Sequence, residues 1–225
     1  MRLHRTVAAV PLIAALLAAG CGAAKGTPAA TATATATATP AAAGSAAQTR
    51  ADAFATVAAR LYREEAAGPA GIRNAGRIAH DPAIVAALRR GSHAGLRAAA
   101  LRELFLPVKH VVRIRIARGP RTLVDVGGTF VAGAESAPVP GGLGRVEVSM
   151  QDVLGLTKLV SRFTGAQIVV HGRPGHVIAS TPAIQDVRMP ASGQVTVGGR
   201  PWVVRTIART GFGGEPLRIS VLIPA

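Results

Sequence analysis

The chain has 225 residues, of which 26 are Lys or Arg and 11 are Asp or Glu, so its formal net charge is +15. A basic balance of this size suggests nucleic acid or an anionic surface as a partner. The basic residues are almost all arginines that stand singly, and one Trp and one Tyr are too few for base stacking. We therefore expect no nucleic-acid partner; anionic headgroups or cell-wall polymers fit the charge better.

Residues 1–20 have the layout of a secretory signal peptide. Arg2 and Arg5 precede an uncharged run from Thr6 to Gly20, which is shorter than the roughly 20 apolar residues of a membrane-spanning helix. The segment 17–21, Leu-Ala-Ala-Gly-Cys, resembles a bacterial lipobox. That resemblance implies cleavage before a cysteine that carries diacylglycerol.

Cys21 is the only cysteine of the chain. A lone thiol forms no internal disulfide, so in an oxidising compartment it needs another role, and lipidation supplies one. Acyl chains contribute about 0.8 kcal/mol per buried methylene, so two or more chains hold a protein firmly on a bilayer. We expect Cys21 to anchor an extracytoplasmic protein in the membrane lipid. Ala18 departs from the branched residue that the lipobox prefers, and the alternative is an ordinary cleaved signal with an incidental cysteine.

Residues 21–47 are low in complexity, with Thr-Ala repeats from Thr31 to Thr39 that end at Pro40. Such a segment has little apolar surface to offset its ordering entropy, so we expect a disordered tether. Its random-coil reach is roughly 25–30 Å, and it is open to O-glycosylation. Residues 48–225 are long enough for one domain with its own core.

Apolar residues at helical spacing recur through 48–107 and predict a helical lead-in. Turn and capping residues divide it into helical segments at Gly68-Pro69, Asp81-Pro82, Gly91-Ser92 and Pro107. Asp81 before a proline is typical of an N-cap followed by proline in the first turn.

The periodicity changes to two in 108–225, where we expect the sheet region. Strand-like runs lie at 112–117, 123–126, 146–150, 167–171, 176–181, 202–208 and 217–223, with a weaker run at 194–197. A Pro/Gly-rich loop is expected over 132–144. Between the strands, Asp152 caps a helix that Gly165 stops. Helices followed by strands with one packed helix indicate an α+β fold with an antiparallel sheet.

Several segments carry a resemblance to a known family: 77–88, 110–116, 123–128, 146–152, 162–165 and 195–199. They resemble Cache-type extracytoplasmic sensor domains, relatives of the PAS fold, and the likeness covers most of 50–224. It implies a single Cache-like domain in which a long N-terminal helix precedes a PAS-like central antiparallel sheet with one packed helix. It also implies a ligand pocket between the sheet and the overlying loops and helix.

Receptors of this class usually continue into a second membrane helix and a cytoplasmic output domain. This chain ends at Ala225, directly after a predicted strand, with no second spanning run. The resemblance therefore implies transduction through a partner, a membrane signalling or envelope protein. The aromatic-and-arginine signature with which one branch of the family grips amino acids has no match here, so the ligand stays open.

Polar side chains on apolar strands are the candidate ligand contacts. Arg113 and Arg115 share one face of a predicted strand, and Asp125 lies on the paired strand. Two arginines on one face can clamp a carboxylate, which predicts a small anionic ligand. The alternative is a solvent-exposed strand face. Lys158, Arg162, Trp202 and Arg205 are weaker candidates, although a tryptophan is more often a core anchor.

The residues that carry catalysis or bind metals have no recognisable arrangement. The histidines at 80, 93, 110, 171 and 176 lack metal-ligand spacing, so we expect no metal and no cofactor. Neither a nucleophile elbow nor a carboxylate pair stands out, so we expect no enzyme. A hydrolase would need Ser149 or Ser161 bonded to a histidine.

The sequence thus favours a lipid-anchored, extracytoplasmic small-molecule-binding or sensing module that acts through a partner protein, without an output domain of its own. The alternative is a structural or interaction lipoprotein of the cell envelope, in which the same fold has a filled pocket and no small ligand.

Overall fold

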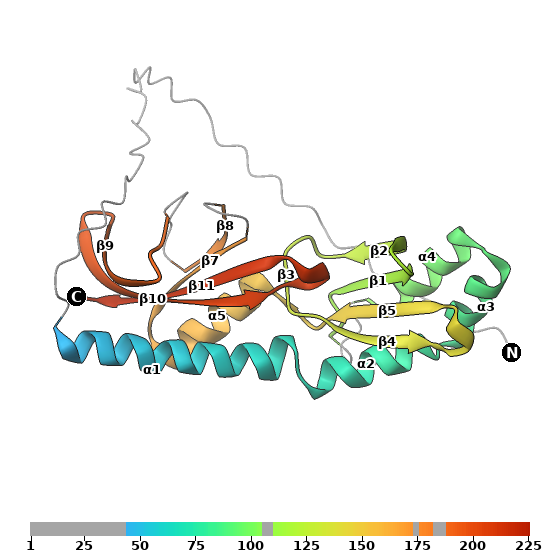
Figure 1. The fold of residues 1–225 in the computed structure, drawn as a ribbon, viewed down its shortest axis with the longest axis horizontal. Helices are drawn as coiled ribbons and strands as arrows, with labels where there is room; N and C mark the ends of the chain where they lie inside the picture. The colour runs from blue at the N-terminus through green and yellow to red at the C-terminus, as the bar shows by residue number, and fades with distance from the viewer. Residues whose placement is uncertain (1–43, 105–109, 173–175, 182–187) are drawn as a thin grey trace, which may run out of the picture. The chain divides into compact units, whose positions relative to one another are not determined.

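The structure, a computed structural model, describes residues 44–104, 110–172, 176–181 and 188–225 (Figure 1). These residues fall in one compact unit, Thr33–Ala225. The predicted signal peptide, Cys21 and most of the predicted tether lie outside the described residues. Helix α1 begins at Ser45, within the last residues of the segment expected to be a tether. Within the described ranges no helix has the length and apolar character that crossing a membrane requires.

A long helical segment opens the described chain and is interrupted where the sequence predicts. It consists of α1 (Ser45–Leu61), a short π-helix (Tyr62–Ala66) and α2 (Pro69–Ala79). Gly68 precedes α2, and a Cβ atom there would lie 2.1 Å from the carbonyl oxygen of Glu64. Only glycine fits this close approach, and Pro69 then starts the next helix without needing a backbone donor.

Two further helices confirm the predicted caps. The carboxylate of Asp81 accepts hydrogen bonds from the N–H groups of Ala83 (2.8 Å) and Ile84 (3.0 Å) at the start of α3 (Pro82–Arg90). This satisfies two of the N–H groups that a helix start leaves unpaired. Ser92 caps α4 (His93–Arg102) in the same way.

The first sheet has four antiparallel strands in the order β2-β1-β5-β4. The strands are β1 (Arg113–Arg118), β2 (Arg121–Gly127), β4 (Glu135–Val139) and β5 (Gly144–Ser149). Two short strands, β3 (Val131–Ala132) and β6 (Gln151–Asp152), pair separately. A 3₁₀ turn, η2 (Pro140–Gly142), connects β4 to β5.

The second sheet has five antiparallel strands in the order β8-β7-β11-β10-β9. Helix α5 (Val153–Thr164) precedes it. The strands are β7 (Gln167–His171), β8 (Val177–Ser180), β9 (Ser192–Val197), β10 (Arg200–Thr210) and β11 (Pro216–Pro224). A 3₁₀ turn, η3 (Phe212–Gly214), joins β10 to β11.

Each sheet has a hydrophobic core of its own. Helices α2, α3 and α4 pack on the first sheet around Ile78, Ile84 and Ile114, which are fully buried. Helices α1 and α5 pack on the second sheet around buried residues such as Leu156 and Ile219. The long helical segment therefore contributes α1 to one core and α2 to the other (Figure 1).

The α+β class with antiparallel strands is confirmed, but the arrangement of the strands differs from the expectation of one central sheet. The described strands form two larger sheets, and the helical lead-in is divided between them. Local periodicity predicts that a segment is a strand, but it does not predict which strand it pairs with. That choice depends on packing between distant parts of the chain.

The loop expected over 132–144 was also wrong in part, because β4 lies within it. Pro138 concealed this strand. A proline is tolerated here because β4 is at the edge of the sheet, where one side needs no ladder hydrogen bonds.

Candidate functional site

The first sheet has one face covered by helices and one face without them. Along β1, Ile114 and Ile116 are buried under α2–α4, while Arg113 and Arg115 point to the opposite side. The register places Arg115 opposite Asp125 of β2 and, on its other side, opposite Glu147 of β5. We call this side of the sheet the polar face.

Arg113, Arg115, Asp125 and Glu147 form a cluster on the polar face, which we call the arginine cluster. Arg113 binds Asp125 in a bidentate pair, from Nε to Oδ1 (2.8 Å) and from Nη2 to Oδ2 (3.0 Å). Arg115 donates to the same Oδ2 from Nε (3.0 Å) and Nη2 (2.9 Å). The sequence-predicted trio is thus brought together, with the carboxylate of Asp125 shared between both guanidinium groups.

The electrostatics of the cluster follow from this geometry. Burial alone would raise the pKa of Asp125, but the hydrogen bonds and positive charges of Arg113 and Arg115 outweigh burial and hold it below its usual value. The hydrogen bond to Asp125 raises the pKa of Arg113 further above its ordinary value, against the opposing effect of burial. Asp125 is therefore an internal anion that Arg113 and Arg115 already share.

The turn between β10 and β11 docks onto the arginine cluster. Phe212 is 3% exposed. The centroid of its ring lies 4.7 Å from the Cζ atom of Arg113 and 4.8 Å from the Cζ atom of Arg115, within the range of cation–π contacts. The N–H group of Gly213 donates to Oε1 of Glu147 (3.0 Å). Gly213 has φ 69°, so the shape of the backbone favours glycine, and a Cβ there would lie 2.3 Å from Nη1 of Arg115 and displace that guanidinium group.

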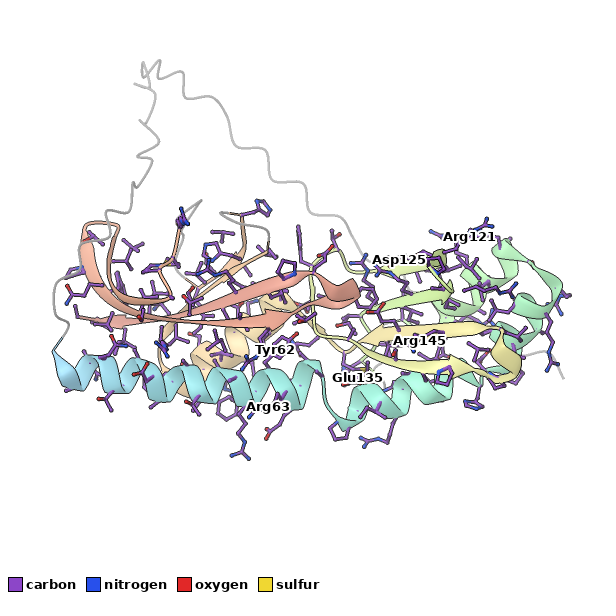
Figure 2. The ribbon with its side chains drawn as sticks, in the orientation of Figure 1. Tyr62, Arg63, Arg121, Asp125, Glu135 and Arg145 are labelled. Carbon is purple, nitrogen blue, oxygen red and sulfur yellow. The ribbon has the colours of Figure 1, made fainter. Side chains whose placement is uncertain are left out.

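A cavity of about 340 Å³ opens beside this docking point. It is lined by Arg115, Ala117, Pro120, Thr122, Ala134, Ser136, Arg145, Glu147 and Gly213. Arg145 of β5 donates to the hydroxyl oxygen of Ser136 (3.3 Å) and forms no ion pair within the described chain. Its charge is therefore available in the cavity, whereas Glu147 is held by Gly213 and lies 3.6 Å from Arg115. Figure 2 labels Arg145 on β5 and Asp125 on β2.

The weaker candidates do not line this cavity. Lys158 and Arg162 lie on the exposed side of α5. Arg205 pairs with Asp52 of α1 (Nε to Oδ1, 3.2 Å) and borders a separate cavity between α1 and β10. Trp202 packs against the core on the other side of the second sheet, and its buried Nε1 has no hydrogen-bond partner in the described chain. This placement matches the core-anchor alternative.

A larger cavity, of about 420 Å³, has an acidic lining that includes Glu64, Glu65 and Asp152. Glu64 already pairs with Arg60 (2.7 Å), and Asp152 accepts from the N–H of Gly155 (2.6 Å) as the cap of α5. None of the sequence-predicted ligand contacts lies there, so we do not assign the binding site to it.

The two serines that a hydrolase would need donate their hydroxyl hydrogen bonds to backbone carbonyl oxygens. The hydroxyl of Ser149 is fully buried and donates to the carbonyl oxygen of Ala132 (3.0 Å). Ser161 donates to the carbonyl of Ala166 (2.8 Å). Among the described side chains, no group of three or more His, Cys, Asp or Glu is placed to hold a metal ion.

Arg145, Glu147 and Phe212 were missed from the sequence. Alternation along 146–150, continued back by one residue, puts Arg145 and Glu147 on one side of a strand, which was a usable signal. Assigning that side to the polar face required the pairing of β5 with β1, which alternation does not reveal. Phe212 lies in a glycine-rich turn, and no local pattern predicts its docking.

Neither a protein-family model nor a curated protein matches the sequence. Solved structures do resemble the chain. The ligand-binding domain of the Pseudomonas aeruginosa PAO1 amino acid chemoreceptor PctB, in complex with L-Arg, has a TM-score of 0.46 at 9% identity, covering 79% of this chain and 87% of that one. The sensor domain of the V. cholerae histidine kinase DctB has a TM-score of 0.44 at 14% identity, covering 79% and 95%.

The periplasmic domain of Vibrio cholerae LuxQ has a TM-score of 0.43 at 10% identity, covering 80% of this chain and 99% of that one. The three structures are a chemoreceptor ligand-binding domain, a histidine kinase sensor domain and a periplasmic domain.

Proposed function

We propose that this chain is an extracytoplasmic small-molecule-binding domain of a sensing system. The ligand binds in the cavity on the polar face, beside Arg145 and beneath the turn that carries Phe212 and Gly213. One observation carries the proposal. A single cavity of about 340 Å³ is lined both by Arg145, which has no ion pair in the described chain, and by the docked turn of the second sheet.

The charges favour a small anionic ligand. Arg113 and Arg115 share the carboxylate of Asp125, and Arg115 also pairs with Glu147, so an incoming carboxylate gains less from them than from Arg145. Arg145 offers the fork of donors that binds a carboxylate in a bidentate way, and the hydroxyls of Ser136 and Thr122 stand in the same lining. This places the ligand contact one strand away from the arginine pair that the sequence suggested.

Binding in this cavity would be read out through the docked turn. Arg115, Glu147 and Gly213 line the cavity and also hold the turn on the polar face. A ligand that moves any of them changes the contact between the first sheet and the β10–β11 hairpin. We propose that a membrane signalling or envelope protein responds to this change, and that lipid on Cys21 keeps the domain at the membrane.

Thermal-shift measurements on the full chain test the binding proposal. A panel of small carboxylates, zwitterions and uncharged analogues is screened, and a ligand raises the melting temperature by mass action. Arg145→Gln should weaken binding of the best anion about tenfold, the loss of one charge-assisted contact. Arg162→Gln, on the exposed side of α5, is the matched control and should leave affinity unchanged. Silence across the panel, or an unaltered affinity of the Arg145 variant, contradicts the proposal.

Metabolic labelling with an alkynyl palmitate tests the anchor. The wild-type chain should take up label and sediment with membranes, whereas Cys21→Ser should do neither. An unlabelled wild-type chain released into the medium would instead support an ordinary cleaved signal peptide.

A structural or interaction lipoprotein remains the second candidate, and one observation favours it. The arginine cluster is already neutralised internally and partly covered by Phe212, as expected of a face that holds a fold together. Crosslinking in cells separates the two functions: this candidate predicts one protein or wall-polymer partner whose recovery is the same in wild type and the Arg145→Gln variant, and no response to small anions.

A further inference from the structure

A second cavity lies at the turn of the β1–β2 hairpin, where helices α3 and α4 meet the first sheet. Its volume is about 230 Å³. The residues that line it are Ala87, Leu88, Gly91, Ser92, His93, Leu96, Arg118, Arg121 and Leu123. We call it the hairpin cavity. It shares no lining residue with the cavity on the polar face.

The floor of the hairpin cavity is apolar. Leu88 and Leu96 are 4% and 3% exposed and belong to the core beneath the first sheet, and Leu123 packs against them half-buried. A floor of this kind gains free energy when a hydrocarbon group replaces water on it.

The rim of the hairpin cavity is basic. Arg118 and Arg121 are exposed and lie directly opposite each other in the register of the hairpin, where two like charges are unfavourable. The backbone of Arg121 belongs to the β1–β2 ladder, but its guanidinium group forms no hydrogen bond or ion pair within the described chain. Figure 2 labels Arg121, at the start of β2. His93 also lines the cavity, and none of the described lining residues is acidic. An anion between the two guanidinium groups would remove the repulsion.

Arg118 is held in place at this rim. Its Nε donates to the carbonyl oxygen of Leu143 (3.0 Å) and its Nη2 to that of Leu88 (3.4 Å). These bonds fix the guanidinium group and leave Nη1 without a partner in the described chain. A preorganised donor loses less entropy when a ligand binds. The first turn of α4, whose unpaired N–H groups also favour an anion, borders the same cavity.

We propose that the hairpin cavity binds a small amphipathic carboxylate. The carboxylate lies between Arg118 and Arg121, and a short hydrocarbon tail covers Leu88, Leu96 and Leu123. The volume limits the ligand to a few carbon atoms beyond the carboxylate. The proposal uses none of the residues assigned to the polar-face cavity, so it stands or fails independently of the sensing function.

Calorimetric titration of the full chain with sodium hexanoate tests this inference. Hexanoate should bind with millimolar or better affinity, whereas the uncharged hexanamide and the tail-less acetate should each bind at least about tenfold more weakly, because each lacks one half of the interaction. Inorganic phosphate distinguishes a general anion site from an amphipathic one and should also bind more weakly than hexanoate.

Variants locate the site. Arg121→Gln should weaken hexanoate binding about tenfold, and it removes no contact of the fold, so the variant remains folded. The Arg118→Gln, Arg121→Gln double variant should abolish binding. Arg162→Gln, on the exposed side of α5 and outside both cavities, should leave it unchanged. Equal binding of hexanamide or phosphate, or an unaltered response of Arg121→Gln, overturns the proposal; loss of binding in Arg145→Gln instead assigns hexanoate to the polar face and also overturns it.

Discussion

The ring centroid of Phe212 lies 4.8 Å from the Cζ atom of Arg115, and Arg113 approaches the same ring. Phe212 belongs to the β10–β11 turn of the second sheet, whereas both arginines belong to β1 of the first. Because Asp125 fixes both guanidinium groups, the ring meets a rigid cationic surface. This contact therefore joins the two sheets and also forms the border of the proposed ligand cavity.

Replacing Phe212 with alanine should destabilise the fold. The side chain is 3% exposed, so its loss removes apolar burial and two cation–π contacts, and we expect a decrease of about 3 kcal/mol in the free energy of unfolding. Chemical denaturation monitored by circular dichroism measures it. Phe163→Ala is the matched control, since that ring is 67% exposed, and its effect should stay below about 0.5 kcal/mol. Equal effects of the two substitutions would show that Phe212 is not docked.

Asp125 should make stability depend on pH in the acid range. Its folded pKa is lowered by Arg113 and Arg115, so the contribution is complete above the unfolded pKa of about 3.9 and is lost as pH falls through the folded pKa. At pH 7, Asp125→Asn should cost about 2 kcal/mol, because it leaves two partly buried arginines without their anion. At a pH below the folded pKa the difference from wild type should disappear.

Asp52→Asn provides the comparison for this pH series. Asp52 pairs with Arg205, but its side chain is 49% exposed, so the pair is well screened and worth at most about 0.5 kcal/mol. Denaturation curves of both variants across the acid range should show a pH-dependent loss of stability for Asp125→Asn and almost none for Asp52→Asn. A constant Asp125→Asn effect at every pH would mean that the loss is steric and not electrostatic.

The strands of the arginine cluster could be predicted because their signal is local. Alternation along 112–117 put Arg113 and Arg115 on one side, and the Gly119-Pro120 turn brought the next strand back with Asp125 on the same side. The helix caps at Asp81 and Ser92 were equally readable, since capping depends on a side chain and the next three residues.

The remainder depended on contacts between distant parts of the chain. Strand β5 pairs with β1, about thirty residues away, and β11 is placed between β7 and β10, so the division into two sheets has no local signature. Phe212 is nearly a hundred residues from the arginines that hold it. The site was thus predictable in its β1–β2 pair but not in its cavity.

Gly127 should tolerate no side chain. It lies opposite Arg113 in the register with φ 118°, and a Cβ there would be 2.3 Å from the carbonyl oxygen of Val112. Gly127→Ala should therefore cost about 3 kcal/mol or more, through both strain and a backbone clash at the end of the arginine cluster.

Gly76→Ala is the control for Gly127→Ala, because it should increase the free energy of unfolding where Gly127→Ala decreases it. It lies inside α2, and a Cβ there meets nothing within 4 Å. Gly76→Ala should raise the free energy of unfolding by about 0.5–1 kcal/mol, because alanine favours the helix and restricts the unfolded chain. Urea denaturation of both variants gives the comparison, and a destabilised Gly76→Ala would contradict the open space beside this position of α2.

Tyr62, the only tyrosine of the chain, gives a spectroscopic readout of how the π-helix is anchored. Its hydroxyl donates to the carbonyl oxygen of Thr210, and Cζ of Arg209 lies 5.8 Å from its ring centroid. Burial raises the pKa of Tyr62, although the charge of Arg209 opposes the shift. Ultraviolet absorbance of the phenolate should therefore show ionisation above the ordinary value of about 10 in the folded chain and near it in denaturant.

The raised pKa of Tyr62 makes the stability of the fold depend on pH in the alkaline range. Since the folded pKa of Tyr62 is raised, its contribution is complete below the unfolded pKa and is lost as pH rises through the folded pKa. At pH 7, Tyr62→Phe should cost about 1–2 kcal/mol, because it leaves the Thr210 carbonyl without that donor, and Tyr62→Leu should cost more through the lost ring. An ordinary tyrosine titration together with an unchanged Tyr62→Phe stability would mean that α1 is not fastened to the β10–β11 hairpin at this point. The docking of Phe212, two residues further along that hairpin, would then be the stronger of the two attachments.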